Sequence, residues 1–198
     1  NVIGGVLIAG SLCIALRIRQ QPAAFTIATL FILVYLLLHL PLEINEPRDP
    51  ASWTGAFEAL ALAAGALIFV TAPPGGALSA FLVPVLLAST LVVIGIQHFM
   101  YADFIATIIP AWFPLRLFLA YFVGVAFFAA AFSLLTNIFL QYAMLLLALL
   151  FAIFVLVLHL PRVWTSPRVE TEWTSLFIAV AMCGISLAWA ERKRKKMI

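Results

Sequence analysis

The chain has 198 residues, of which 66% are hydrophobic and 10% are charged, with a mean hydropathy of +1.19. Soluble domains are about half apolar and about a quarter charged, so this composition excludes an ordinary soluble domain. The net charge of +3 comes from few basic residues, and five of them lie in the tail at 192–196, which argues against nucleic-acid binding. The lipid bilayer is therefore the expected environment of the chain.

Long apolar runs predict an all-α transmembrane bundle. A helix needs about 20 apolar residues to cross a bilayer, and these runs do not alternate as the strands of a membrane barrel do. Seven spans are predicted, at about 2–17, 23–40, 53–72, 78–100, 115–135, 140–160 and 173–190.

Prolines, glycines and polar residues mark the breaks between these spans. The segment 17–22 is a predicted turn, in which Pro22 suits the start of a helix, and the Pro-Pro-Gly-Gly run at 73–76 separates two spans. Pro84 predicts a kink inside its span, and the Thr-Asn pair at 136–137 predicts a turn. The segment 101–114 contains too many prolines to span, and its aromatic residues favour a re-entrant or interface-lying position.

One polar stretch occurs twice in the chain. Residues 39–57 and 159–177 share eight identities at a constant spacing of 120 residues, without a gap. The matched residues are His39, Leu40, Pro41, Pro47, Arg48, Trp53, Thr54 and Phe57 in the first copy, and His159, Leu160, Pro161, Pro167, Arg168, Trp173, Thr174 and Phe177 in the second. A discontinuous match of this length predicts an internal duplication.

The duplication predicts two parallel repeats of four helices. The three spans before residue 73 match the last three spans, whereas the span at 78–100 has no counterpart within the chain. We therefore expect the first repeat to lack its first helix here, with that helix encoded upstream; the alternative is a repeat that has lost it. The predicted division is a first repeat at 1–76, a second repeat at 77–190 and a basic tail at 191–198.

The basic residues predict the orientation in the membrane. Arg17, Arg19 and the tail fall on one face, because successive helices alternate in direction, and Lys and Arg favour the cytoplasmic side. The loops at 41–52, 100–114 and 161–172 then lie on the outer face, together with the His-Leu-Pro motifs. The expected location is the cytoplasmic membrane of a bacterium. An even number of helices separates the two copies, so the repeats are parallel and not inverted.

Three histidines, His39, His98 and His159, lie near the outer ends of spans. They are candidates for metal ligands or proton carriers, or for helix caps whose rings bond to carbonyls or to a loop carboxylate. The His-Leu-Pro turn favours capping, and no closely spaced Cys/His set predicts a metal site.

Glu58 is the acidic residue placed deepest in a predicted span, about five residues from the start of its helix. Its counterpart in the second copy is Ile178, so the repeated scaffold does not require a carboxylate there. Ionisable groups inside a membrane are functional candidates by default. We expect Glu58 either to accept a proton or bind a ligand, or to form a salt bridge between the repeats with Arg116 or His98.

Other polar residues allow structural explanations. Asp103 and Arg116 flank the proline-rich segment and are expected either to fix a lid over a pocket or to be solvated interface charges. Arg48 and Arg168 are expected to pair with acidic neighbours in their own loops. Those neighbours are Glu46, Asp49, Glu170 and Glu172. The tryptophans expected to form an interfacial belt are Trp53, Trp112, Trp164 and Trp173.

Several short motifs make the second repeat similar to the DoxX-like membrane proteins. They are Gly-Ile-Gln-His-Phe at 95–99, Ile-Pro-Ala-Trp-Phe-Pro at 109–114, Tyr-Phe-Val-Gly at 121–124 and Leu-His-Leu-Pro at 158–161. The resemblance covers about 79–190 as one four-helix unit and 1–72 as most of another. It implies a compact four-helix membrane bundle that binds a quinone or a lipid-like ligand, because the name-giving members are subunits of a thiosulfate:quinone oxidoreductase. It supplies no catalytic residues, and the tandem duplication departs from the single-unit pattern of the family.

Three functions are compatible with these features. The first is a non-catalytic, accessory subunit of a larger membrane complex, with other membrane proteins as partners and the redox association that the resemblance implies. The second is a quinone-interacting component of a membrane oxidoreductase, with Glu58, His98, Asp103 and Arg116 around an outer-face pocket. The third is a small-solute or proton carrier, which parallel repeats and the scarcity of charge in mid-membrane disfavour. No nucleotide loop, haem motif or nucleophile motif is present, which favours a chain without catalytic activity of its own.

Overall fold

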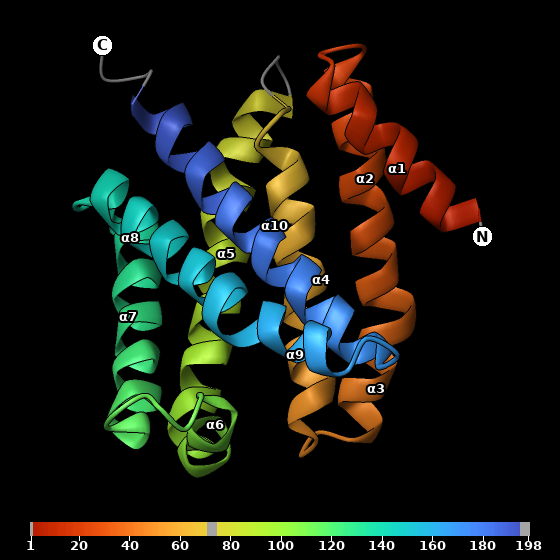
Figure 1. Cartoon of the computed structure of the whole chain (residues 1–198). Helices are drawn as coiled ribbons and strands as arrows, with labels where there is room; N and C mark the ends of the chain where they lie inside the picture. The colour runs from red at the N-terminus through yellow and green to blue at the C-terminus, as the bar shows by residue number, and fades with distance from the viewer. Residues whose placement is uncertain (1, 71–74, 195–198) are drawn as a thin grey trace. The chain divides into compact units, whose positions relative to one another are not determined.

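The computed structural model describes residues 2–70 and 75–194, and its regular elements are helices (Figure 1). These residues contain no strand, so the all-α prediction is confirmed. The chain divides into two compact units, Asn1–Thr90 and Leu91–Ile198. Helix α5 crosses this division.

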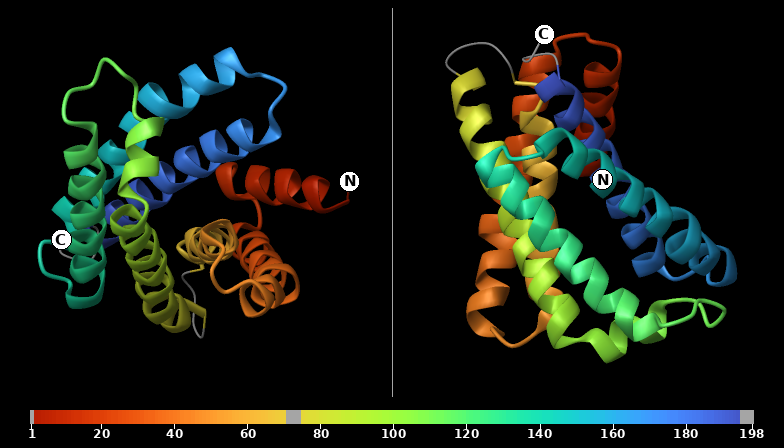
Figure 2. Two further views of the ribbon diagram at one scale, coloured as in Figure 1. Left: turned by 90° about the horizontal axis from the view of Figure 1, so that it is seen from below. Right: turned by 90° about the vertical axis from the view of Figure 1, so that its left-hand side faces the viewer.

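The first unit is built around helix α2, which packs against both α1 and α4 (Figures 1 and 2). Its elements are α1 (Val2–Ala15), α2 (Gln20–Val34), the π-helical turn η1 (Tyr35–His39), α3 (Leu40–Asn45), α4 (Pro50–Leu67) and the part of α5 (Gly75–Met100) that precedes residue 91. Small residues line the packed face of α4, where Ala56, Ala61, Ala63 and Ala64 are fully buried. Small side chains let helix backbones approach closely, which is the usual means of packing in a membrane.

The second unit is built around helix α8, which packs against α7 and α10. Its elements are the end of α5, α6 (Ala102–Ile108), α7 (Arg116–Thr136), α8 (Leu140–Ile153), the π-helical turn η2 (Phe154–His159), α9 (Leu160–Thr165) and α10 (Glu170–Arg194). The short helix α6 lies against α7. The predicted proline-rich segment thus forms a helix of 7 residues and an irregular stretch, in which Trp112 is 71% exposed.

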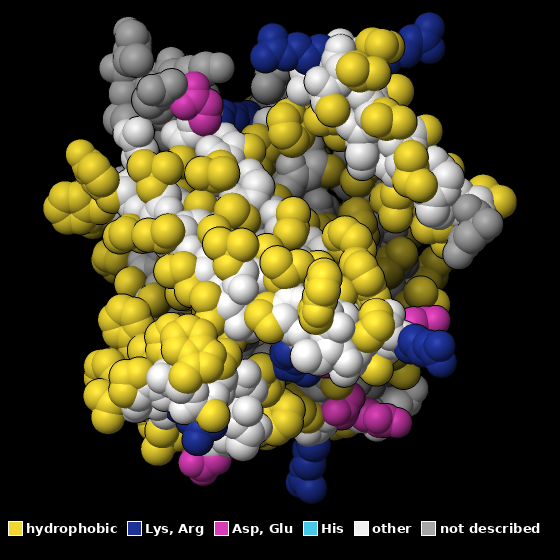
Figure 3. Space-filling model, in the orientation of Figure 1, with side chains coloured by type: hydrophobic (Ala, Val, Ile, Leu, Met, Phe, Trp, Pro, Cys, Tyr) yellow, Lys and Arg dark blue, Asp and Glu magenta, His cyan; other side chains and the backbone are white. Residues whose placement is uncertain are grey.

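The helices are those of an integral membrane protein. In the described part of the chain, five stretches are long and apolar enough to cross a bilayer: Gln20–Asn45, Gly76–Met100, Arg116–Thr136, Leu140–Thr165 and Glu170–Arg192. Figure 3 shows hydrophobic side chains over the helix faces toward the viewer and charged side chains near helix ends. Helix α1 has 14 residues, and α4 is not among the five, so the seven spans stay a prediction.

Two helices continue past the point at which the sequence predicts that they end. Pro41 and Pro161 were expected to end their helices, but helical structure runs on to Asn45 and Thr165. The reason is the π-helical turn before each proline, in which the amide of Leu40 donates to the carbonyl oxygen of Tyr35, five residues back. A proline has no amide hydrogen and clashes with the preceding turn of a regular α-helix; a widened turn relieves that conflict. The loops predicted at 41–52 and 161–172 are correspondingly shorter.

Other boundaries also differ from the prediction. Helix α4 begins at Pro50 instead of 53 and ends at Leu67, and α10 extends from Glu170 to Arg194 instead of 173–190. The predicted Pro-Pro-Gly-Gly break lies partly outside the described residues, as does the end of the basic tail. The turn at 136–137 is confirmed, since Asn137 has a left-handed backbone with φ of 61° and follows the last residue of α7.

Local features of the first unit recur 120 residues later in the second. The turns before α2 and α8 each place two residues in left-handed conformation, Arg17 and Arg19 in one and Asn137 and Phe139 in the other. Helices α3 and α9 have the same length and position, and α4 and α10 begin at residues 50 and 170.

The side-chain contacts of the two loops recur as well. The indole Nε1 of Trp53 donates to the carbonyl oxygen of Pro47 at 3.0 Å, and Trp173 donates to Pro167 at the same distance. Each indole also stacks on the phenylalanine four residues later, with ring centroids 6.0 Å apart in both units. The matched tryptophans and prolines therefore fasten each loop to the helix that follows it.

We predict that Trp53→Phe and Trp173→Phe each lower the free energy of unfolding by about 0.5–1 kcal/mol, because each removes one hydrogen bond and keeps an aromatic ring. The measurement is denaturant unfolding in detergent. Trp112→Phe is the matched control, since Trp112 is exposed and its ring contact with Phe113 survives the change. Equal losses for all three variants would contradict the fastening role.

Candidate functional site

The π-helical turn of the first unit brings a histidine against a glycine of the neighbouring helix. A Cβ atom added to Gly55 would lie 2.9 Å from Cε1 of His39, so Gly55 on α4 leaves the space that the ring occupies. The described part of the chain offers the His39 ring no hydrogen bond. The predicted capping role of His39 is therefore not realised through a bond to a carbonyl or to a loop carboxylate.

Glu43 lies four residues after His39, in α3. It is only 7% exposed, and its Oε1 atom has no hydrogen-bond partner. The carboxylate interacts electrostatically with the phenol of Tyr35, in η1. A buried carboxyl oxygen without a partner is costly, so Glu43 is an unusual polar group in the first unit.

The corresponding turn of the second unit contains an ion pair instead. The Nη2 atom of Arg162 donates to Oε1 of Glu172 at 2.7 Å, and His159 interacts electrostatically with both residues. The Nδ1 atom of His159 is buried without a hydrogen-bond partner. The predicted pairing of Glu172 with Arg168 is therefore wrong: the fold places Arg162, ten residues earlier in the chain, beside this carboxylate.

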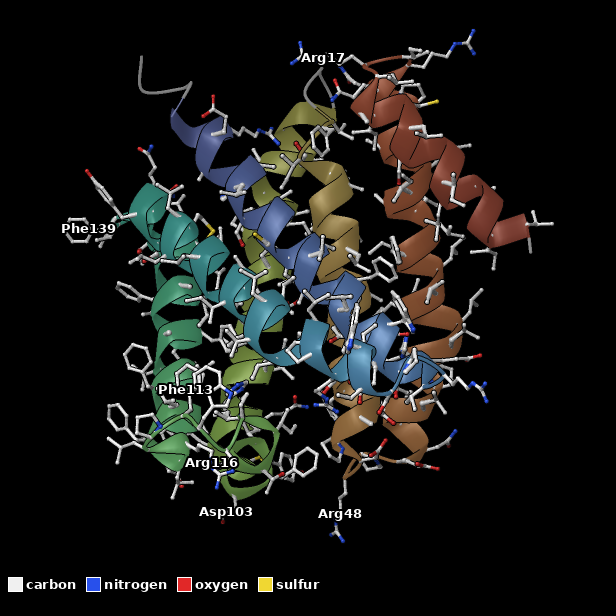
Figure 4. All side chains as sticks on the ribbon, viewed as in Figure 1. Arg17, Arg48, Asp103, Phe113, Arg116 and Phe139 are labelled. Atoms are coloured by element: carbon white, nitrogen blue, oxygen red, sulfur yellow. The ribbon has the colours of Figure 1, made fainter. Side chains whose placement is uncertain are left out.

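Asp49 caps the N-terminus of α4 in the first loop. It accepts hydrogen bonds from the backbone amides of Ala51 and Ser52 at 3.2 and 3.0 Å, and from the Ser52 hydroxyl at 2.7 Å. The predicted pairing of Asp49 with Arg48 is not formed, because the carboxylate is turned toward the helix and Arg48 extends away from it (Figure 4). The hydrogen bond from the Ser52 side chain, with help from the two amides, lowers the pKa of Asp49.

The four residues predicted to surround an outer-face pocket do not form a cluster within either unit. The His98 ring lies 2.8 Å through Nδ1 from the carbonyl oxygen of Ile94 and meets the Phe127 ring edge-on, with centroids 5.2 Å apart. Asp103 and Arg116 are exposed (Figure 4), and they form no ion pair with each other. Glu58 belongs to the first unit and its predicted partners to the second, so that salt bridge stays a prediction.

The second unit contains an apolar groove between α7 and α8, with a volume of about 470 Å³. Its lining includes Phe122, Ala126, Ala129 and Ser133 of α7, and Leu146 and Leu150 of α8. None of the predicted candidate residues lines it. A groove with this lining suits a hydrocarbon chain and offers almost no polar group for chemistry.

No group of three or more His, Cys, Asp or Glu residues in the described ranges is arranged to hold a metal ion. Among the predicted belt tryptophans, Trp112 and Trp164 are the most exposed, at 71% and 86%. Both cysteines, Cys13 and Cys183, are free thiols.

Sequence reasoning missed Tyr35 and Glu43. The signal that identifies them is the comparison of the two copies: the residues 120 positions later are Val155 and Val163. The same comparison identifies Glu58, whereas Glu43 falls in the loop predicted at 41–52, where a carboxylate needs no explanation.

Comparisons with protein families, with curated proteins and with solved structures found no match for this chain. The resemblance to DoxX-like proteins therefore stays a prediction.

We predict that Asp49 makes the protein less stable in acid. A carboxyl whose pKa is lowered on folding contributes stability above its unfolded pKa and loses it as the pH falls through the folded value. We expect Asp49→Asn to remove this part of the pH dependence, measured as unfolding in detergent from neutral to acidic pH. Glu46→Gln, which removes an exposed carboxylate of the same loop, is the control. If Asp49→Asn lowers the free energy of unfolding by the same amount at every pH, the proposed contribution of Asp49 to the pH dependence is contradicted.

Proposed function

We propose that the chain is a DoxX-like membrane protein made of two parallel repeats, and that it serves as a non-catalytic accessory subunit of a larger membrane complex. The repeats are the predicted residues 1–76 and 77–190, with seven spans in this chain. The proposed location is a bacterial cytoplasmic membrane, with the basic tail in the cytoplasm and the two tryptophan-fastened loops outside.

The recurrence of local structure supports the duplication. Left-handed turn residues, π-helical turns, short helices after the prolines and indole hydrogen bonds all recur at the same spacing. Several of these features, such as the π-helical turn, are rare in proteins. Their joint recurrence at one offset is best explained by two copies of one unit.

The observation that carries the accessory role is how the polar residues are used. Asp49 caps a helix, Arg162 and Glu172 bond to each other, and His98 bonds to its own helix. These groups are engaged in holding the fold, and the described residues that were candidates for catalysis are not gathered within one unit. Polar groups that are engaged in this way support a role in holding partners rather than in chemistry.

The apolar surface of the second unit supports contact with lipid or with other membrane proteins. Large side chains of α7 and α8 outside the groove are well exposed; they include Phe118, Phe132, Leu135 and Leu145. Such a surface is costly in water and is matched by hydrocarbon or by another transmembrane helix.

A quinone-interacting role is the second candidate, and the groove between α7 and α8 favours it. Quinones of membranes carry long hydrocarbon tails, and the groove is lined almost wholly by apolar side chains. The redox association implied by the DoxX-like resemblance fits both candidates.

The test is gentle purification in detergent, followed by native mass spectrometry. We expect co-purifying membrane proteins at fixed stoichiometry, because the accessory role requires stable partners. A lone chain that carries a quinone would overturn the accessory role and support the second candidate. A lone chain with neither would contradict both. If a quinone is retained, Phe122→Ala and Phe118→Ala show whether it lies in the groove, because Phe122 lines the groove and Phe118 does not. A quinone in the groove is lost from Phe122→Ala and kept by Phe118→Ala.

A further inference from the structure

Glu43 is a buried acid that the fold of the first unit does not use. It is 7% exposed, its Oε1 atom has no partner, and it lies near the end of a 26-residue apolar stretch. An acid at such a place is expensive as a carboxylate and much less so as a neutral carboxylic acid. Nothing in the packing of α3 explains why an aliphatic residue would not serve better.

The second unit provides an internal control. Its position equivalent to Glu43 is Val163, which is 5% exposed, and α9 there has the same length and place as α3. The position equivalent to Tyr35 is Val155, and the π-helical turn forms without the phenol. The scaffold therefore folds without either polar group, and their presence in the first unit calls for a function.

Tyr35, His39 and Glu43 lie at intervals of four residues along one continuous helical stretch, and Glu43 interacts electrostatically with the phenol of Tyr35. His39, between the other two, has no hydrogen bond in the described part of the chain. Glu43 is the member nearest the loop at 46–49.

We propose that Glu43 forms a proton-binding site, in which its carboxyl takes up a proton from the side of the 46–49 loop. Uptake joins one proton to the carboxylate oxygen and gives a neutral acid. The site does not rest on the accessory role.

The other ionisable groups around Glu43 are few. Tyr35 comes from the same continuous helix, Glu46 follows α3, Asp49 caps the N-terminus of α4, and α4 itself contains Glu58. Asp49 is engaged by Ser52, and Arg48 points away from the helices (Figure 4). No described Lys or Arg forms an ion pair with Glu43.

The experiment uses dicyclohexylcarbodiimide on the purified chain in detergent, with peptide mass spectrometry. This apolar reagent reacts with protonated carboxyls: the acid hydrogen moves to a nitrogen, the oxygen bonds to the central carbon, and rearrangement gives an N-acylurea that contains every atom of both reactants. We expect an adduct on Glu43 that increases as the pH is lowered and is lost in Glu43→Gln. Exposed Glu46 remains unlabelled, and Glu58 is mapped separately.

The wild-type adduct needs no variant, so the site remains testable if Glu43→Gln fails to fold. Absence of an adduct on Glu43 at every pH would overturn the site.

Discussion

A proline inside a long apolar helix is the constraint on which both units depend. It lacks an amide hydrogen and presses on the preceding turn, yet in a membrane the freed carbonyl has no water to bond. Each unit widens one turn before its proline, so that the amide of residue 40 or 160 reaches five residues back. This lets the helix continue to Asn45 or Thr165, and it fixes the short loop that the tryptophan fastens to the next helix.

The two units share this scaffold and differ in the polar groups placed on it. The second unit pairs Arg162 with Glu172 and has valine where the first has Glu43. The proposed duplication predicts divergence of this kind, since one copy can hold the structure while the other acquires reactive groups. The proposed proton site lies in the first copy, and the groove between α7 and α8 lies in the second.

Most helices and the Thr-Asn turn were predictable, because long apolar runs and left-handed turn residues are local signals. The continuation through Pro41 and Pro161 was not, since proline is a local signal for a helix end and the π-helical turn that offsets it is decided by packing. The partner of Glu172 was not predictable either, because spacing in the sequence favours Arg168 and only the fold brings Arg162 beside it. The burial of Glu43 was not predictable for a related reason: it depends on α3, a helix that begins directly before a proline and has no local signal in the sequence.

The measurement that tests the parallel duplication most directly is the side of the membrane on which the two loops lie. Arg48→Cys and Arg168→Cys are made separately in a chain with Cys13 and Cys183 changed to alanine, and vesicles are treated with a maleimide that cannot cross the membrane. Two parallel repeats predict labelling of both positions from the same side, the outer one. Labelling of the two positions from opposite sides would contradict the account.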